Sequence, residues 1–353
     1  MTPNRATLTP FADVGWLSEQ LGEEVAEVEI DPVALGGAFC TLRRLSVRFV
    51  AGGERRFVAK APREDAATRD TARALGLFER ERRFYAELAP RCPVAVPACA
   101  YAGPPGTEQL LLEDLGALRG VDQVDGAGVA DAARVIDALA RLHAAHWEGV
   151  RTEPLPAWLV GAEDRAFAQM ACAIAARGAP VLCERYRDRL SAAALDGVRR
   201  AGARFDAVLG RCARGPLTLV HGDARIDNVL FRADGSPVFI DWQVPARARG
   251  TQDVAYVLST SLRPADQAAH ALALLERWHA RIGSLGVHGY AWDDCVRHYR
   301  EHVLYSLFAA FALMGTLDVG EGRTARLADA LVLRNVGHAE AIGAFAVLSR
   351  ENR

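Results

Sequence analysis

The pattern of hydrophobic and polar residues changes character about a third of the way along the chain. Before about residue 115, apolar residues often alternate with polar ones, as at Leu45, Val47 and Phe49, and this period of two predicts β-strands. The strands expected are a hairpin over 45–60 with its turn at 51–54, and shorter strands near 94–96, 98–102 and 108–113. The same part is expected to hold a short amphipathic helix within 10–30 and one long helix over 68–89.

From residue 129 onward, apolar residues recur every three or four positions, which predicts amphipathic helices. The expected helices cover roughly 129–143, 162–177, 183–212, 253–262, 265–283, 290–314 and 322–346. A polar β-hairpin region interrupts them, with strands expected at 217–220, 228–231 and 237–242. The pattern therefore predicts an α+β protein with a small β-rich lobe over residues 1–115 and a larger, mainly helical lobe over 116–353.

Composition narrows the class of protein. Half of the 353 residues are hydrophobic and the net charge is −2, which suits a soluble globular protein and gives no support for nucleic acid or an anionic membrane as a partner. The longest apolar stretch, from Val303 to Gly315, is too short to span a bilayer, and the N-terminus lacks the pattern of a signal peptide. The seven scattered cysteines include no CxxC pair and indicate reduced thiols in a cytoplasmic protein.

The chain contains a single lysine, Lys60, among 42 basic residues. In a chain so rich in Arg, a retained Lys indicates a place that a compact ammonium fits and the planar fork of Arg does not. Lys60 ends the second strand of the expected hairpin, and a lysine on such a strand favours a role as a clamp on nucleotide phosphates. An exposed position on an edge strand is the alternative.

Three polar residues of the β-hairpin region carry a second signal. Asp223 and Asn228 stand at the two ends of a loop, and Asp241 ends the strand that is expected to return beside Asn228. The Asn228 amide oxygen and the Asp241 carboxylate are hard oxygen ligands suited to Mg²⁺. Asp223 is then left as a base for an incoming hydroxyl group. Ordinary turn chemistry is the alternative explanation for all three residues.

A resemblance to a known family of enzymes rests on this region. The loop begins Val-His-Gly-Asp at 220–223, continues to Asn228, and is followed by Ile-Asp-Trp-Gln at 240–243. This motif resembles the catalytic loop and metal-binding aspartate of the aminoglycoside phosphotransferase and choline kinase superfamily, and its form is similar to the ecdysteroid-kinase-like and macrolide-phosphotransferase branches. The resemblance implies a bilobal protein-kinase-like fold, ATP or GTP as phosphoryl donor, Mg²⁺ as cofactor and a small-molecule hydroxyl as acceptor.

The resemblance also implies partners for two charged residues. Glu81 lies inside the apolar stripe of its helix and needs a cation, and the family pattern supplies Lys60; exposure of Glu81 to solvent is the alternative. Arg225 stands two residues after Asp223, where it would stabilise charge on the transferring phosphate. The alternatives for Arg225 are a surface position or an ion pair with Asp227.

A further set of residues in the first lobe would surround the nucleotide. Val58 would cover the adenine, because strand alternation places it on the same face as Lys60. Gly36 and Gly37 would let backbone amides approach the phosphates, or would simply form a turn. The backbone at Glu113 and Leu115 would form a hinge that reads the edge of the adenine; an ordinary strand and linker is the alternative.

Three residues near the loop are expected to have structural roles. Asp253 resembles the family's aspartate at the start of a helix and would cap that helix or brace the catalytic loop. His221 is expected to form hydrogen bonds within the loop rather than act as a base. His143 lies on an apolar helix stripe and is expected to be a hydrogen-bonded histidine of the core.

The acceptor is the part of the function that the sequence determines least. Candidate lining residues in the helical lobe are of mixed character: Trp158, Glu163, Asp164, Asp293, Asp294, Glu301, His302 and Tyr305. Tyr305, Phe308 and Phe311 favour a partly apolar pocket over an acidic cleft, unless they only pack helices together. We predict a small-molecule kinase, with antibiotics among its candidate acceptors. The alternatives are a pseudokinase scaffold that binds nucleotide and a housekeeping sugar or amino-alcohol kinase.

Overall fold

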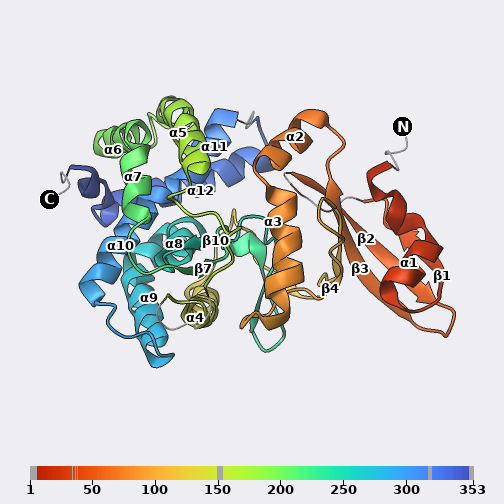
Figure 1. The fold of residues 1–353 in the computed structure, drawn as a ribbon. Coiled ribbons are helices and arrows are strands. Elements are labelled where there is room, and N and C mark those ends of the chain that lie inside the picture. The colour runs from red at the N-terminus through yellow and green to blue at the C-terminus, as the bar shows by residue number, and fades with distance from the viewer. Residues whose placement is uncertain are drawn as a thin grey trace. The chain divides into compact units, whose positions relative to one another are not determined.

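The computed structural model describes residues 6–33, 35, 37, 39–148, 154–316 and 320–349. The chain divides into two compact units, which we call the sheet unit (residues 1–119 and 238–244) and the helical unit (residues 120–237 and 245–353) (Figure 1). The predicted division after residue 115 lies close to the first of these boundaries, and the structure adds the short segment 238–244 to the sheet unit. The assignment of nucleotide binding to one part and catalysis to the other stays a prediction.

The sheet unit is built on a five-stranded antiparallel sheet with the strand order β1-β2-β3-β5-β4. The strands are β1 (Val25–Ile30), β2 (Cys40–Phe49), β3 (Glu54–Pro62), β4 (Cys99–Tyr101) and β5 (Leu110–Glu113). The predicted hairpin is confirmed as β2 and β3, which pair from Cys40 opposite Pro62 to Arg48 opposite Glu54. One face of the sheet packs on α1 (Val14–Leu21) through Leu17, Leu45, Val47 and Leu111.

The segment 10–30 contains a strand as well as the predicted helix. α1 ends at Gly22, whose φ of 69° lies in the left-handed region that glycine reaches without strain. β1 follows, and its sequence Val-Ala-Glu-Val-Glu-Ile has the alternation of a strand at an exposed edge. Of the other predicted strands, 94–96 contributes only an isolated bridge, between Ala95 and Val238.

The helix expected over 68–89 is interrupted near its middle. The chain forms α2 (Ala66–Ala74), α3 (Leu77–Arg83) and a π-helical turn over Phe84–Leu88. Gly76 separates α2 from α3 with a φ of 65°, a conformation that ends a helix and that a side chain with a Cβ seldom adopts. The break gives α3 its own start, and α3 is the helix that carries Glu81.

The helical unit contains nine α-helices among its described residues, with short strands between them. The helices are α4 (Val129–Ala145), α5 (Arg165–Arg185), α6 (Ala192–Ala203), α7 (Phe205–Cys212), α8 (Thr251–Tyr256), α9 (Pro264–Ser284), α10 (Trp292–Tyr305), α11 (Leu307–Thr316) and α12 (Arg323–Ala341). The predicted helix over 290–314 divides in two at Ser306, and the one over 183–212 is interrupted at Arg204 and also over 186–191, so that residues 183–185 belong to α5. Strands β7 (Thr218–Val220) and β10 (Ala246–Ala248) pair antiparallel, and β8 (Val229–Phe231) follows the catalytic loop.

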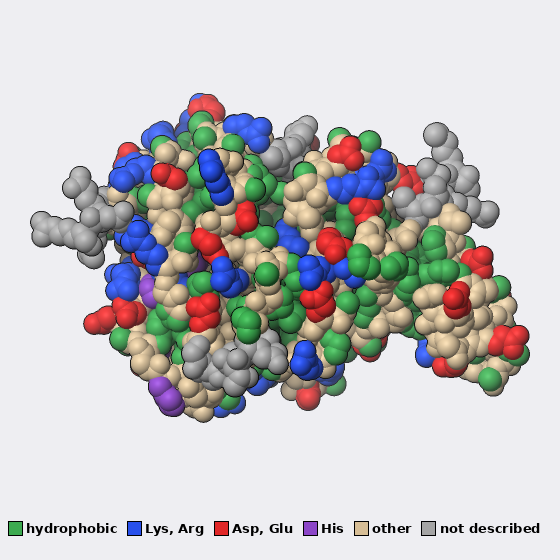
Figure 2. Space-filling model, viewed as in Figure 1, with side chains coloured by type: hydrophobic (Ala, Val, Ile, Leu, Met, Phe, Trp, Pro, Cys, Tyr) green, Lys and Arg blue, Asp and Glu red, His purple; other side chains and the backbone are tan. Residues whose placement is uncertain are grey.

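Within the described residues, α5 is the one helix long and apolar enough, by length and composition, to cross a membrane. Its packing accounts for its apolar character, because it lies against α11 and α6. Gly178 of α5 approaches the backbone of Phe311 in α11 so closely that an added Cβ would lie 2.0 Å from the Phe311 carbonyl oxygen. On the face that Figure 2 shows, acidic and basic side chains are intermixed, without a large patch of one sign.

Candidate active site

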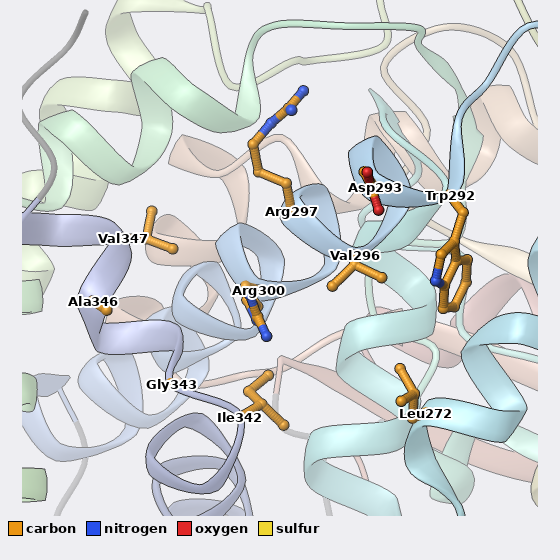
Figure 3. A pocket seen from close by; sticks show the side chains of 10 residues that line it. All are labelled: Leu272, Trp292, Asp293, Val296, Arg297, Arg300, Ile342, Gly343, Ala346 and Val347. Atoms are coloured by element: carbon orange, nitrogen blue, oxygen red, sulfur yellow. The ribbon is translucent and has the colours of Figure 1, made fainter.

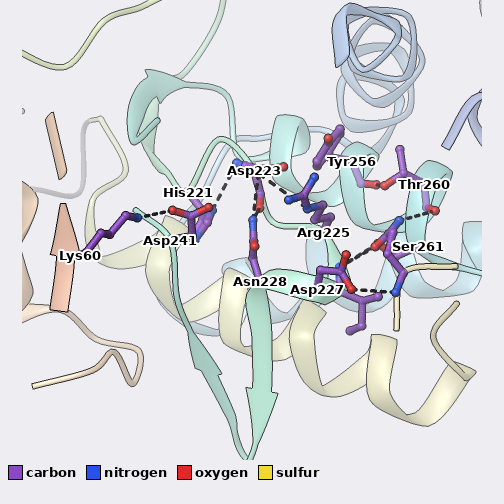
Figure 4. Close-up of polar contacts among 12 residues, drawn as sticks. Lys60, His221, Asp223, Arg225, Asp227, Asn228, Asp241, Tyr256, Thr260 and Ser261 are labelled. Carbon is purple, nitrogen blue, oxygen red and sulfur yellow. Dashed lines mark hydrogen bonds and ion pairs between the residues drawn. The ribbon is translucent and has the colours of Figure 1, made fainter. Parts of the chain in front are cut away.

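Lys60 lies on β3 with its ammonium group buried between two carboxylates of the sheet unit. Its Nζ is 2.8 Å from both carboxylate oxygens of Glu81 and 2.6 Å from Oδ1 of Asp241 (Figure 4). Lys60 is 5% exposed and Glu81 is 1% exposed. Both alternatives from the sequence, a lysine on a solvated edge and a glutamate in solvent, are therefore wrong. β3 pairs on both sides, with β2 and with β5, so it is not an edge strand.

Asp241 reaches Lys60 from an unusual backbone conformation. Its φ is 63°, and it is the one non-glycine residue with a positive φ in the described parts of the chain. Such conformations cost free energy and persist where the surroundings enforce them. Here Trp242 is fully buried and stacks on Phe84 at a centroid distance of 3.9 Å, and the N–H of Phe239 donates to the carbonyl of Ala95. These contacts fix the short segment on each side of Asp241.

The cluster of Lys60, Glu81 and Asp241 combines one ammonium with two carboxylates. Burial lowers the pKa of Lys60, but Asp241 and Glu81 outweigh this effect and hold the pKa well above its usual value. Burial raises the pKa of Glu81 to about 7, although the Lys60 ammonium opposes the rise. Two carboxylates around one ammonium leave an excess of negative charge, which favours the binding of a further cation.

The other residues predicted to surround a nucleotide lie on the same unit. Val58 is half-buried on β3, two residues before Lys60 and on the same face of the strand. Gly37 lies so near Cys40 that an added Cβ would come within 2.7 Å of the Cys40 carbonyl oxygen. Gly36 lies outside the described residues. The close approach at Gly37 explains the need for glycine there without assigning it a ligand.

The predicted hinge lies at the end of β5, and two of its backbone groups already have partners. The N–H of Glu113 donates to the carbonyl of Ala98 at 2.8 Å, and the carbonyl of Leu115 accepts from the N–H of Leu118 at 2.9 Å. The Glu113 side chain also accepts from the N–H of Ala98. Adenine recognition by the backbone of Glu113 and Leu115 therefore stays a prediction, with fewer free groups than expected.

Asp223 and Asn228 lie together in the loop of the helical unit (Figure 4). Nδ2 of Asn228 donates to the backbone carbonyl and to Oδ2 of Asp223, each at 2.9 Å. The two hydrogen bonds fix which end of the amide faces Asp223 and leave the Asn228 oxygen as the group that could bind a cation. Arg225 is beside Asp223 as well, with its Nε 3.9 Å from Oδ2. The Tyr256 hydroxyl also hydrogen-bonds Asp223, and burial together with this carboxylate raises the pKa of Tyr256.

Asp253 on α8 holds the start of this loop by its backbone. Its Oδ2 accepts from the N–H of His221 at 2.7 Å, and its Oδ1 accepts from the N–H of Gly222 at 2.9 Å. Nε2 of His143 is 3.2 Å from Oδ2 of Asp253, and Nε1 of Trp278 donates to Nδ1 of His143 at 3.0 Å. Because Nδ1 accepts, a neutral His143 carries its proton on Nε2 and donates to Asp253. The expected brace at Asp253 and the expected core histidine are confirmed.

The acceptor candidates are mostly engaged in structural contacts. Glu163 pairs with Arg247, and Glu301 forms a buried ion pair with Arg249. Asp164 caps α5 by accepting from the N–H of Phe167. His302 is fully buried. The prediction that these side chains line an acceptor pocket stays a prediction, and Glu163, Asp164 and Glu301 already have partners within the helical unit.

A groove of about 630 Å³ lies on the helical unit, apart from the residues predicted to be catalytic (Figure 3). It is lined by Leu272, Trp292, Asp293, Val296, Arg297, Arg300, Ile342, Gly343, Ala346 and Val347. Asp293 is the one acceptor candidate among them. The Arg297 side chain pairs with Asp294, one turn along α10. The groove is open, and nothing in its lining connects it to Asp223.

A metal at the candidate site would depend on few protein ligands. The parts of the chain that the structure describes contain no group of three or more His, Cys, Asp or Glu side chains arranged to hold a metal. The Asn228 amide oxygen on the helical unit and the Asp241 carboxylate on the sheet unit are each of a kind that Mg²⁺ accepts, and this ion keeps several waters and takes further oxygens from substrate phosphates. The negative excess around Lys60 fits a cation too.

Comparison with known proteins gives a consistent result. The family model described as ecdysteroid kinase-like matches residues 41–285. A spectinomycin phosphotransferase, solved in complex with ADP and spectinomycin, is 10% identical over 95% of this chain and 97% of that chain, with a TM-score of 0.52. Choline kinase from Cryptosporidium parvum Iowa II is 11% identical over 97% of this chain and 93% of that chain, with a TM-score of 0.51.

A third solved structure, macrolide 2′-phosphotransferase from Brachybacterium faecium, is 19% identical over 96% of this chain and 97% of that chain, with a TM-score of 0.44. No match was found among the curated proteins. At these identities the likenesses to the spectinomycin and choline enzymes concern the fold, and they confirm the predicted α+β, protein-kinase-like fold class. The superfamily resemblance inferred from the loop motif is confirmed by the family match.

Proposed function

Because the chain belongs to the ecdysteroid kinase-like family, we propose that it is a small-molecule kinase that transfers the γ-phosphoryl group of ATP or GTP to an acceptor hydroxyl. The observation that carries this proposal is the burial of the one lysine between Glu81 and Asp241. Burying the charges of Lys60 and Glu81 is costly, and such clusters are concentrated at functional sites. Residues 1–115 are assigned nucleotide binding, and residues 116–353 are assigned catalysis and acceptor binding.

The Lys60 cluster supplies the charge that holds the nucleotide. Lys60 binds the α- and β-phosphates, and Glu81 holds the ammonium in place, because both of its oxygens lie at 2.8 Å. Asp241 and Asn228 are the ligands assigned to Mg²⁺, which supplies charge neutralisation at the phosphates when bound. Val58, Gly36, Gly37, Glu113 and Leu115 are assigned to the adenine and phosphate surroundings.

Asp223 is the proposed general base. Its carboxylate accepts the proton of the acceptor hydroxyl as that oxygen forms a bond to the γ-phosphorus. The bond from the γ-phosphorus to the bridging oxygen breaks at the same time, and the nucleoside diphosphate leaves with the electron pair. Arg225, beside Asp223, stabilises the negative charge of the transferring group. The hydrogen bonds from Asn228 keep the Asp223 carboxylate in one orientation.

The surroundings of Asp223 support an acceptor with an apolar ring system rather than a polycation. Tyr256 hydrogen-bonds Asp223, and Tyr305 is among the groups that raise the pKa of Tyr256. From Tyr305 an aromatic series continues to Phe308 and Phe167, with centroid distances of 6.5 and 6.1 Å. All of these side chains are partly or largely buried in the helical unit. Steroid, macrolide and nucleoside-like alcohols are the acceptor classes that this lining supports.

An acceptor screen tests the proposed function. Release of ADP or GDP is measured with macrolides, aminoglycosides, nucleoside antibiotics, sterols, amino sugars and amino alcohols, each with and without Mg²⁺. Asp223→Asn serves as the matched control for contaminating phosphatase. Turnover that needs Mg²⁺, an acceptor and Asp223 is expected for at least one class. Nucleotide binding without turnover for any acceptor would instead favour the pseudokinase scaffold, and turnover confined to amino sugars or amino alcohols would favour the housekeeping kinase.

A further inference from the structure

Gln123 lies at the centre of a buried hydrogen-bond network at the end of the catalytic loop. Its side chain is fully buried; Nε2 donates to the carbonyl of Thr260 at 2.8 Å, and Oε1 accepts from the N–H of Ile226 at 3.1 Å. Its backbone N–H donates to Oδ1 of Asp227 at 2.8 Å. Ile226 and Asp227 immediately precede Asn228 in the chain. Gln123 therefore holds Ile226 and Asp227 in place, and these two residues set the backbone position of Asn228.

Arg334 of α12 completes the network from a distant part of the sequence. Its Nη1 donates to the carbonyl of Gln123 at 2.6 Å and to that of Thr260 at 3.3 Å, and its Nη2 donates to the carbonyl of Val124 at 2.7 Å. The side chain is buried, and burial lowers the pKa of Arg334. All three of these hydrogen bonds are to carbonyl oxygens. A buried guanidinium compensated in this way requires all three carbonyls to stay in place.

The two ends of the catalytic loop are held by different devices. At the start, Asp253 accepts from the backbone of His221 and Gly222. At the end, Gln123 and Arg334 hold the chain just before Asn228. Asn228, directly after the second anchor, donates through its side chain to Asp223, which lies between the two anchors. The position of the Asn228 amide thus depends on the second anchor, which is chemically independent of the first.

We propose that Gln123 and Arg334 are positioning residues for Asn228, an inference that rests on the proposed function because that function assigns Asn228 to Mg²⁺. Residues that orient a metal ligand through hydrogen bonds typically change metal affinity or activity by about 10- to 100-fold when they are removed. Gln123 and Arg334 touch neither the nucleotide nor the acceptor in this proposal. Their effect passes through the backbone of residues 226–227 to the amide of Asn228.

Hydrogen exchange tests the positioning role without any need for turnover. In Gln123→Met and Arg334→Met, which keep side-chain length but remove the polar groups, peptides covering 223–231 should exchange roughly tenfold faster or more than in the parent, the scale on which orienting residues act. Peptides from α5 and α6 in the same unit should exchange at the parent rate. If Gln123→Met does not fold, Gln123→Asn is the second variant. Its amide sits on a side chain one methylene shorter and no longer reaches Ile226 and Thr260, so the same faster exchange over 223–231 is expected.

A Mg²⁺ titration of nucleotide binding tests whether the effect reaches Asn228. With a fluorescent ATP analogue, the half-saturating Mg²⁺ concentration should rise by about 10- to 100-fold in both variants, while the nucleotide Kd at saturating Mg²⁺ stays near that of the parent. Arg334→Lys should recover only part of the loss, because a single ammonium cannot bind the three carbonyls as a planar guanidinium does. Arg323→Met is the matched control, since Arg323 also joins α12 to the 120s segment, through an exposed ion pair with Asp122.

The outcomes of these experiments distinguish a failure of the positioning role of Gln123 and Arg334 from a failure of the proposed metal role of Asn228. If loop exchange and the Mg²⁺ titration both match the parent, Gln123 and Arg334 have no positioning role. Faster loop exchange with an unchanged Mg²⁺ titration would also overturn the proposal, because the network would then hold the loop without placing Asn228. A parent protein that binds nucleotide without any dependence on Mg²⁺ would refute the metal role of Asn228 itself, and faster loop exchange in the variants would identify that as a failure of the proposed function rather than of the network.

Discussion

The Lys60 cluster of the sheet unit and the catalytic loop of the helical unit stabilise their polar side chains by different means. In the cluster, Lys60 is in direct contact with Glu81 and Asp241, and all three side chains are charged groups. In the loop, most of the contacts run through backbone amides or neutral side chains, as between Gly222 and Asp253 or between Ile226 and Gln123. One region relies on ion pairs, and the other relies on a set of directional hydrogen bonds.

The difference teaches which contacts a ligand can replace. A phosphate oxygen can take the place of a carboxylate beside an ammonium, so the contacts of Lys60 can be exchanged as a nucleotide binds. A backbone N–H that is already bonded to Asp253 has no reason to change partner, so the loop is prearranged before any ligand arrives. We therefore expect substitutions in the cluster to alter nucleotide binding, and substitutions in the loop to alter the chemical step.

Asp223→Asn should give the largest effect and test the loop side of this comparison. Loss of the general base is expected to lower kcat by roughly 10²-fold or more while the nucleotide Kd stays unchanged, because the amide retains the size of the carboxylate. The measurement is single-turnover kinetics with the acceptor found by the screen. Asp241→Ala provides the contrast, since it should weaken Mg²⁺-dependent nucleotide binding as well as turnover. Overlapping metal titrations for Asp241→Ala and the parent would exclude Asp241 as a metal ligand.

Lys60→Arg tests the cluster side and should change turnover or the nucleotide KM by roughly tenfold, the scale of one lost charge-assisted hydrogen bond. The wider guanidinium cannot occupy the place of the ammonium between Glu81 and Asp241 without displacing one of them. Because Lys60 is the one side-chain amine in the chain, an acyl-phosphate nucleotide probe should label it alone, apart from the α-amine of Met1. Labelling that persists in saturating ATP and Mg²⁺ would remove Lys60 from the nucleotide site.

Measuring the free energy of unfolding as a function of pH should separate the stability of the helical unit from nucleotide binding by the Lys60 cluster. Burial lowers the pKa of His338 from 6.5 to about 4. The unfolded chain then binds more protons than the folded one below pH 6.5, so the stabilising contribution is present above this pH and is lost as the pH falls through about 4. Between pH 6.5 and pH 5 the free energy of unfolding should decrease by about 1.5 kcal/mol through this residue.

Urea unfolding at several pH values measures this contribution of His338. His338→Asn should flatten the dependence on pH, whereas His270→Asn, at an exposed position on α9, should leave the slope as in the parent. Equal slopes for His338→Asn and the parent would assign the pH response to another group. Nucleotide binding by the Lys60 cluster is best compared with loop chemistry above pH 6.5, where this loss of stability is absent.

The smallest effect is expected from Trp278→Phe, which removes the hydrogen bond from Trp278 to His143. A buried acceptor left without its donor costs about 1–3 kcal/mol, although the Asp253 carboxylate still fixes the proton of a neutral His143 on Nε2. We expect the melting temperature to fall and kcat to fall by a few-fold at most, because Asp253 keeps both of its bonds to the loop. A loss of turnover as large as that of Asp223→Asn would show that the brace acts in the chemical step itself.

Local patterns were sufficient to predict the elements that carry the site. The alternation around Leu45 and Val47 predicts the hairpin of β2 and β3, and the loop motif places Asp223 and Asn228 close enough to bond. The position of Glu81 inside an apolar stripe correctly indicates a buried carboxylate that needs a cation. In each case, the informative residues lie within one or two elements. The hydrophobic period of such an element, together with its residue types, indicates which of its side chains are buried.

Contacts between distant elements could not be predicted in this way. Trp278 bonds to His143 across 135 residues, and Arg334 bonds to Gln123 across 211 residues. Neither residue breaks the period of its helix, so nothing local indicates a partner. The acceptor candidate Glu301 illustrates the same limit, since its ion pair with Arg249 forms only when α10 packs on the segment before α8. A charged residue on a helix gives no sign of whether its partner is a ligand or the protein.

The network around Arg334 also has a consequence for the order in which the protein is made. The loop that ends at Asn228 is translated 95 residues before the start of α12 at Arg323, and α12 supplies the guanidinium that binds the carbonyls of Gln123 and Val124. A nascent chain that has not yet emerged from the ribosome beyond Arg334 cannot form these hydrogen bonds, although every residue of the loop is already present. Release of the last helix thus becomes the step that completes the site, and a product truncated before α12 would lack it.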